Sequence, residues 1–127
     1  MLRPGAVTDA EYFHHSWLAS LKDYHLRGRM GRDIIADYSR LVAIPACSHP
    51  DRFTVACSPT EPAFILGWAY VWNETLGYIC VRQRYQRVGV ASALSKAAGG
   101  KYYALPPDSR MLSLVKGREF RPLGAFP

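Results

Sequence analysis

Cysteine is scarce in this 127-residue sequence, and no repeat or low-complexity segment is present. The three cysteines, Cys47, Cys57 and Cys80, are an odd number at irregular spacing, which is not the pattern of a disulfide framework. Cys47 and His49 lack a second pair of ligands that would complete a metal site, so we expect no bound metal. Free, buried thiols in a reducing compartment are the expectation that remains.

Long apolar segments are also missing. The longest apolar run extends from Pro62 to Trp72, whereas a membrane-spanning helix needs about 20 residues. Met1 to Pro4 are followed by Gly, Thr and Asp residues and not by the apolar core of a secretory signal. The sequence therefore predicts a cytoplasmic protein, in the host cytoplasm if it is viral, with no membrane partner.

Acidic residues are outnumbered. There are 10 Asp and Glu against 16 Lys and Arg, which gives a net charge of +6. This balance favours an anionic partner, such as a phosphate-bearing cofactor, nucleic acid or an acidic protein surface, although a soluble protein with extra surface Lys and Arg is equally compatible with it. The length and the 49% apolar content predict one globular domain over residues 1–127.

The N-terminal third has helical periodicity. Thr8 and Glu11 have the spacing of a capping box at the start of a helix. Apolar residues then recur every three or four positions along one predicted helix face, at Phe13, Trp17, Leu21 and Tyr24. A second helical stripe, which ends at Pro45, contains Ile34, Tyr38, Leu41 and Val42.

The rest of the chain alternates between strand and helix patterns. Three strands are predicted at residues 53–57, 64–72 and 76–82, the last two joined as a hairpin by Asn73-Glu74-Thr75. A helix from Val90 to Ala98 ends at Gly99-Gly100. A strand at residues 102–105, a helix at 108–115 and an edge strand in the tail complete an α/β sheet.

The stretch from Arg84 to Gly100 combines a basic turn with a predicted helix start at which Gly89 has no side chain and Ala91 has only a methyl group. The first N–H groups of a helix have no partner within it, and they carry the positive end of the helix dipole. Gly89 and Ala91 would let a phosphate reach these groups, and Arg82, Arg84 and Arg87 add positive charge. The stretch predicts a pyrophosphate cradle, with a plain tight helix start as the alternative.

Two common phosphate-binding loops do not match. No Gly-Lys-Ser/Thr follows, as it would in a nucleotide hydrolase, and the three-glycine dinucleotide fingerprint is absent. Instead, the segment Gln86-Arg87-Val88-Gly89-Val90-Ala91 resembles the Gln/Arg-x-x-Gly-x-Gly/Ala motif of the GNAT N-acetyltransferases. The segments HHSWLASL and LGYICVRQRYQRVGVASAL resemble a small GNAT-like group of bacteria and their phages. The resemblance extends from about Leu2 to about Leu114.

This resemblance implies a fold and a cofactor. The fold is a mixed, mostly antiparallel central sheet flanked by helices, with a V-shaped splay between strands four and five. The cosubstrate is acetyl-CoA, whose pantetheine arm would pair with the strand backbone at Ile79, Cys80 and Val81. Its pyrophosphate would bind near Arg82 and along the loop residues Gln86, Arg87, Val88, Gly89, Val90, Ala91 and Ser92.

The implied reaction is direct attack of a primary amine on the thioester, which requires a base and a proton donor. Tyr78 and Glu74 are the candidates, although Glu74 is also typical of a solvated turn residue and Tyr78 of a core aromatic. The segment 108–116 contains no tyrosine to protonate the leaving thiolate. A catalytically weak GNAT-like protein that binds a protein partner is therefore the alternative function.

The acceptor amine could be a protein lysine or a small molecule. The shortness of the chain favours an open cleft, or a pocket completed by a second subunit of a homodimer. The arginines cluster around one loop and are not spread along a face, which disfavours a nucleic-acid partner.

Overall fold

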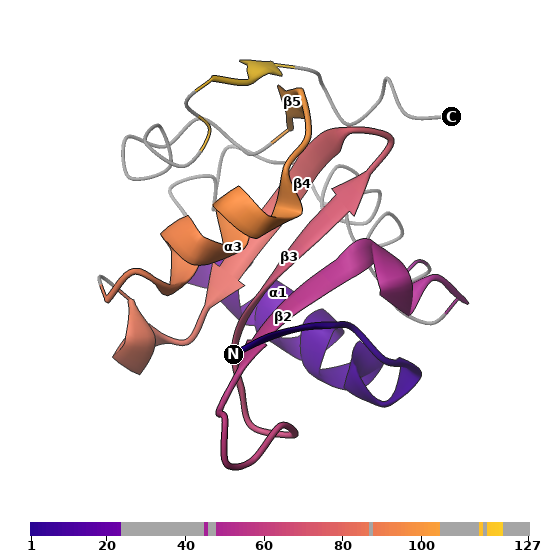
Figure 1. Cartoon of the computed structure of the whole chain (residues 1–127). Coiled ribbons are helices and arrows are strands. Elements are labelled where there is room, and N and C mark those ends of the chain that lie inside the picture. The colour runs from indigo at the N-terminus through magenta and orange to yellow at the C-terminus, as the bar shows by residue number, and fades with distance from the viewer. Residues whose placement is uncertain (24–44, 46–47, 87, 105–114, 116, 121–127) are drawn as a thin grey trace.

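The fold is built around one six-stranded sheet in the order β1-β2-β3-β4-β5-β6 (Figure 1). The structure is a computed structural model of the whole chain, and it describes residues 1–23, 45, 48–86, 88–104, 115 and 117–120. The strands are β1 (Leu2–Pro4), β2 (Phe53–Cys57), β3 (Ile65–Trp72), β4 (Thr75–Val81), β5 (Tyr102–Tyr103) and β6 (Glu119–Phe120). The α-helices are α1 (Ala10–Asp23) and α3 (Val90–Ala98), and three short 3-10 turns are η1 (Val7–Asp9), η2 (Pro50–Arg52) and η3 (Gln83–Tyr85).

The sheet is mixed. Strands β1 to β4 pair in antiparallel fashion, whereas β4–β5 and β5–β6 pair in parallel. The parallel step from β4 to β5 requires a crossover, which α3 provides. Figure 1 shows α3 on one face of the sheet and α1 on the other.

The face toward α1 is aromatic. Phe13 of α1 stacks on Phe53 of β2 with ring centroids 4.3 Å apart, and Trp17 of α1 meets Tyr78 of β4 edge-on at 6.3 Å. Trp68 of β3 lies between these pairs and is fully buried. The predicted helical stripe therefore packs on the sheet at Phe13 and Trp17, which are almost completely buried.

On β2 and β3, the face toward α3 carries small residues. Because side chains alternate along a strand, Ala56 on β2 and Gly67 and Ala69 on β3 point away from the aromatic face. The small residues let α3 approach the strands closely, and Leu94 fills the interface with no exposed surface.

Most elements that the sequence predicts are present, with small differences in their ends. Residues 34–42, 108–114 and Leu105 lie outside the described residues, so the predictions there stay predictions. The predicted capping box is displaced: the carboxylate of Asp9, and not of Glu11, accepts a hydrogen bond from the Ala6 N–H at 2.8 Å. Pro45 is helical and its carbonyl accepts the His49 N–H at 2.7 Å, but the residues before it lie outside the described ones, so the predicted helix end at Pro45 stays a prediction.

The β3–β4 hairpin has a two-residue turn, and Thr75 already belongs to β4. Asn73 and Glu74 both have positive φ, 53° and 58°, as a type I′ turn requires. The Glu74 carbonyl then accepts the N–H groups of Lys101 and Tyr102 at 2.9 and 3.0 Å. The turn is therefore also the point at which the chain returns from α3 to the sheet.

We expect Gly100→Ala to destabilise the fold more than Gly117→Ala. Both glycines have positive φ, 93° and 86°, so alanine is strained at each. A Cβ at Gly100 would lie 2.8 Å from the Glu74 carbonyl oxygen, whereas at Gly117 it meets no atom within 4 Å. Chemical denaturation should give losses of about 3 and about 1 kcal/mol. Equal losses would show that the contact with Glu74 is unimportant.

A second prediction concerns the start of α1, where Asp9 accepts hydrogen bonds from Arg3 at 2.8 and 3.0 Å and from Ala6. Burial raises the pKa of the Asp9 carboxyl, but the hydrogen bonds from Arg3 and Ala6 and the Arg3 charge outweigh this effect, so the pKa is lowered. Because the folded pKa is below the unfolded value, the stabilisation is present above about pH 4 and is lost as the pH falls through the lowered pKa.

We therefore expect Asp9→Asn to cost about 2 kcal/mol at pH 7, as measured by urea unfolding, and much less near pH 3. Glu11→Gln, which alters an exposed carboxylate at the start of the same helix, is the matched control and should change stability little at either pH. An equal loss for Asp9→Asn at both pH values would contradict this account.

Candidate functional site

One edge of β4 carries backbone groups that no described strand pairs with. The Arg82 N–H donates to the Leu66 carbonyl at 2.8 Å, and hydrogen-bonded and non-hydrogen-bonded pairs alternate along an antiparallel ladder. Cys80 therefore bonds to β3, whereas the N–H and C=O groups of Ile79 and Val81 point to the opposite edge. On that edge, the β5 residues pair only with Thr75 and Leu76 within the described chain.

A β-bulge at Gly77 divides β4 into two parts. Tyr70 is opposite Tyr78 but Val71 is opposite Leu76, so Gly77 is the extra residue. A Cβ at Gly77 would lie 2.8 Å from the Tyr70 ring, which explains the glycine. The bulge reverses the faces, so that Thr75 takes the α1 side that Tyr78 and Cys80 also occupy.

The loop after β4 turns the chain toward α3. After η3, the side-chain amide of Gln86 donates to the Val81 carbonyl at 3.2 Å. This bond uses one of the outward-pointing groups of β4 and fixes the beginning of the loop beside the open edge. Arg87 lies outside the described residues.

The first turn of α3 has no side-chain cap. Gly89 is the N-cap residue, with φ 90° and ψ 1°, a conformation that favours glycine. The first helical hydrogen bond runs from Ala93 to the Gly89 carbonyl, so the N–H groups of Val90, Ala91 and Ser92 have no acceptor among the described residues. A Cβ at Gly89 would meet no atom within 4 Å, so the N-cap position itself is open.

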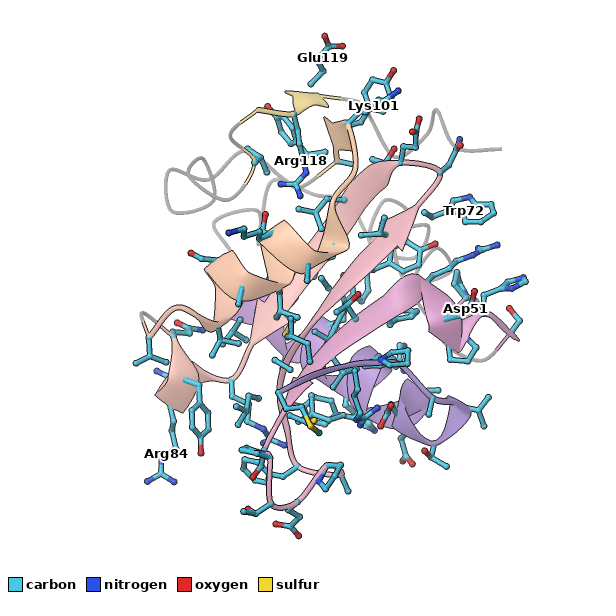
Figure 2. All side chains as sticks on the ribbon, viewed as in Figure 1. Asp51, Trp72, Arg84, Lys101, Arg118 and Glu119 are labelled. Atoms are coloured by element: carbon cyan, nitrogen blue, oxygen red, sulfur yellow. The ribbon has the colours of Figure 1, made fainter. Side chains whose placement is uncertain are left out.

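The basic residues near the loop differ in their freedom. The guanidinium of Arg82 lies 4.8 Å from the ring centroids of both Tyr12 and Phe64, and its Nε donates to the Ile65 carbonyl. Arg84 is exposed, and Figure 2 shows it projecting from η3 away from the sheet. Arg82 is therefore held between α1 and the beginning of β3, whereas the Arg84 side chain is exposed to solvent.

Comparison with solved structures places this arrangement among known folds. The YjaB structure from Escherichia coli, in its apo form, matches with a TM-score of 0.58 at 14% identity, over 77% of this chain and 63% of that chain. The PaiA N-acetyltransferase of Thermoplasma acidophilum, solved in complex with coenzyme A, matches with a TM-score of 0.55 at 14% identity, over 77% and 68%. The chain has the fold of the GNAT N-acetyltransferases.

A GCN5-related N-acetyltransferase from Kribbella flavida has the same fold, with a TM-score of 0.55 at 18% identity over 89% of this chain. The match covers only 32% of the Kribbella chain, and that with YjaB covers less than two thirds of YjaB. No family model and no curated protein matches the sequence. The structural likeness confirms the fold that the motif from Gln86 to Ala91 predicted.

Within the GNAT fold, the two candidate catalytic residues lie in different environments. Tyr78 is 4% exposed, and its ring packs beside Trp17 and Trp68 on the α1 face. Glu74 is in the hairpin turn with a side chain 60% exposed, and its carboxylate lies 3.7 Å from the Lys101 amine. The structure does not bring Tyr78 and Glu74 together.

Cys80 shares the α1 face with Tyr78, because the two residues are two positions apart on β4. Its thiol donates to the Ser16 carbonyl at 3.7 Å, and the Ser16 hydroxyl accepts a hydrogen bond from the Trp68 indole at 2.8 Å.

Among the described residues, no three His, Cys, Asp or Glu side chains gather as a metal site requires. No helix in this part of the chain is long and apolar enough to span a membrane.

Two features of the site were missed from the sequence. The bulge at Gly77 is one, although a glycine inside a strand pattern is a known signal for it. The other is the Arg82 clamp with Tyr12 and Phe64, which joins residues distant in sequence and has no local signal.

Burial raises the pKa of the Tyr12 hydroxyl even though the nearby Arg82 charge opposes the change.

Proposed function

We propose that this protein is an acetyl-CoA-dependent N-acetyltransferase, which moves an acetyl group to a primary amine by direct attack. The observation that carries the proposal is the open, uncapped start of α3 at Gly89, directly after a strand edge with outward-pointing backbone groups. The GNAT fold supports it, since PaiA, which shares the fold, was solved with coenzyme A. The acceptor is proposed as a protein lysine or a small-molecule amine.

The residues of the loop fit a diphosphate. The N–H groups of Val90, Ala91 and Ser92 supply donors at the positive end of the helix dipole, and Arg84 supplies an exposed positive charge. Ile79 and Val81 would pair with the amides of the pantetheine arm through the outward edge of β4. When bound, acetyl-CoA would supply the acetyl group as a thioester.

The V-shaped splay between β4 and β5 belongs to this proposal. The two strands pair at Thr75 and Leu76, and the Ala104 N–H still donates to the Leu76 carbonyl at 2.9 Å. Beyond this point, Ile79 and Val81 have no β5 partner among the described residues. A widening gap there would admit the pantetheine arm, and the outward N–H of Ile79 could then polarise a carbonyl oxygen.

A binding protein on the same fold is the second candidate. It is favoured by the positions of Glu74, which is paired with Lys101 at the hairpin turn, and of Tyr78, which is enclosed by aromatic rings. Such a protein would hold coenzyme A, or a protein partner, without a fast acetyl transfer. Detection of amine acetylation separates the two functions.

The first test of the proposal is coenzyme A binding and its dependence on Gly89. We expect a dissociation constant in the micromolar range, so that coenzyme A at about 100 times this value should stabilise the fold by about 2.7 kcal/mol in a thermal-shift assay. Gly89→Glu should weaken binding at least about a hundredfold, because the carboxylate occupies the anion position and repels it.

Gly117→Glu is the matched control for this test. Gly117 has nearly the same φ as Gly89, 86° against 90°, and a Cβ there is equally free of contacts. It should therefore cost similar stability but leave the affinity for coenzyme A unchanged. Persistent binding in folded Gly89→Glu protein, or equal losses in the two variants, would place the phosphate elsewhere.

A second test concerns catalysis. We expect Tyr78→Phe to lower the acetylation rate by about a hundredfold or more, if its hydroxyl donates or relays a proton, and Glu74→Gln to have the smaller effect. Both should leave coenzyme A affinity within a few-fold, since neither lies in the loop. Rate assays with amine panels measure this, and a larger loss for Glu74→Gln would show that the thioester lies nearer the hairpin turn than we propose.

A further inference from the structure

The C-terminal end of α3 is held by one arginine. The guanidinium of Arg118 donates to the Ser95 hydroxyl at 2.8 Å, to the Ser95 carbonyl at 2.6 Å, and to the Gly99 carbonyl at 3.1 and 2.7 Å. These acceptors are at the helix end, where the Ser95 carbonyl also accepts the Gly99 N–H at 3.3 Å. Figure 2 shows Arg118 between β6 and this end of α3.

Arg118 itself is fixed to the sheet. It directly precedes β6, whose Glu119 N–H donates to the Lys101 carbonyl at 2.9 Å, and its own N–H donates to the Val115 carbonyl at 3.0 Å. The β6 strand pairs with β5, and β5 pairs with β4. The guanidinium therefore connects the end of α3 to the same sheet that carries the open edge of β4.

Within the described residues, the opposite end of α3 has no side-chain hydrogen bond of this kind, and Val90 and Ala91 are held only by packing against the core. Its N-cap residue, Gly89, has no side chain, and no side-chain cap bond is present. A helix of nine residues is about 13 Å long, so a tilt of about 10° around its C-terminal end would move the first turn by about 2 Å. Binding sites require positions held to about 0.5 Å, so the anchoring of the far end of α3 matters at Gly89.

We propose that Arg118 is a positioning residue, which sets the distance between the phosphate-binding start of α3 and the open edge of β4. This inference rests on the proposed function, because a ligand must span both places for the distance to matter. The loop itself is local, so a free anion needs no such alignment. Coenzyme A, which has a diphosphate and a pantetheine arm, needs both places at the correct separation.

The alignment of α3 depends on the forked geometry of the Arg118 guanidinium and not on its positive charge alone. A cation near a helix C-terminus is favourable in itself, and a lysine would retain that benefit. Arg118 instead bonds three acceptor atoms on two residues through three nitrogens, which a lysine amine on a flexible stem cannot reproduce. Arg118→Lys should therefore restore little of the lost alignment.

The experiment compares two ligands in wild type, Arg118→Ala, Arg118→Lys and Lys101→Ala, by NMR titration well below the unfolding temperature. Lys101→Ala removes an exposed cation one residue before β5. Among the described residues the Lys101 side chain forms an ion pair with Glu74 and no hydrogen bond with α3, so this variant is the matched control. We expect both Arg118 variants to bind coenzyme A at least about tenfold more weakly and inorganic pyrophosphate within about threefold of wild type. Lys101→Ala should match wild type for both ligands.

Residual dipolar couplings of the ligand-free proteins provide the second measurement. We expect the α3 amides to report a changed helix orientation relative to β3 in the Arg118 variants and no change in Lys101→Ala. An unchanged orientation, an equal loss of both ligands, or full recovery in Arg118→Lys would overturn the inference. If Arg118→Ala does not fold, Arg118→Lys, which keeps the charge and part of the bonding, decides the result.

If wild type binds pyrophosphate but not coenzyme A, the proposed function fails and the role of Arg118 in ligand alignment fails with it. If wild type binds both ligands and the Arg118 variants lose neither, only the inference about Arg118 fails. The two failures are therefore distinguishable.

Discussion

The unequal hydrogen bonding of the two edges of β4 is the constraint on which the rest of the structure depends. One edge pairs with β3 along the whole strand, from Thr75 opposite Trp72 to Val81 opposite Gly67. The other edge pairs with β5 only at Thr75 and Leu76 within the described residues. The chain must leave the end of β4, cross the sheet as α3 and return to the beginning of β4, so the start of α3 necessarily lies beside the open part of the edge.

The point at which the chain returns from α3 to the sheet is also fixed by specific contacts. Glu74, at positive φ, accepts two N–H groups from the incoming chain, and Gly100 approaches its carbonyl too closely for any side chain. Together with Arg118, this contact fixes the C-terminal end of α3, whereas the N-terminal end has no side-chain cap within the described part of the chain. The fold thus concentrates its anchors at one end of the helix and its unpaired donors at the other.

The packing of the sheet explains why the candidate catalytic residues have less structural support than the candidate binding residues. The α1 face is closed by aromatic rings, and Tyr78 contributes to that packing. The bulge at Gly77 then reverses the alternation, so residues before it cannot be assigned to a face by counting back from Tyr78. Glu74 is separated from the open edge near Ile79 by this bulge and lies in the turn.

The sequence predicted the sheet and the start of α3 after Gly89 because both have local signals, and the binding of an anion there stays a prediction. Alternation in residues 53–57, the apolar run before Trp72 and the small residues at Gly89 and Ala91 each depend on near neighbours. The predicted position of the capping box was wrong, because the carboxylate of Asp9 is held by hydrogen bonds from Arg3, which connect β1 to η1. The Arg82 clamp and the Arg118 anchor join segments far apart in sequence, which periodicity does not detect.

Amide hydrogen exchange followed by NMR, with and without coenzyme A, tests the central claim most directly. Binding across the start of α3 and the edge of β4 should slow exchange at Val90, Ala91 and Ser92 and at Ile79 and Val81. The Cys80 amide should change much less, because the ladder already directs it toward β3. Protection confined to other parts of the protein, or equal protection of Ile79, Cys80 and Val81, would contradict the account.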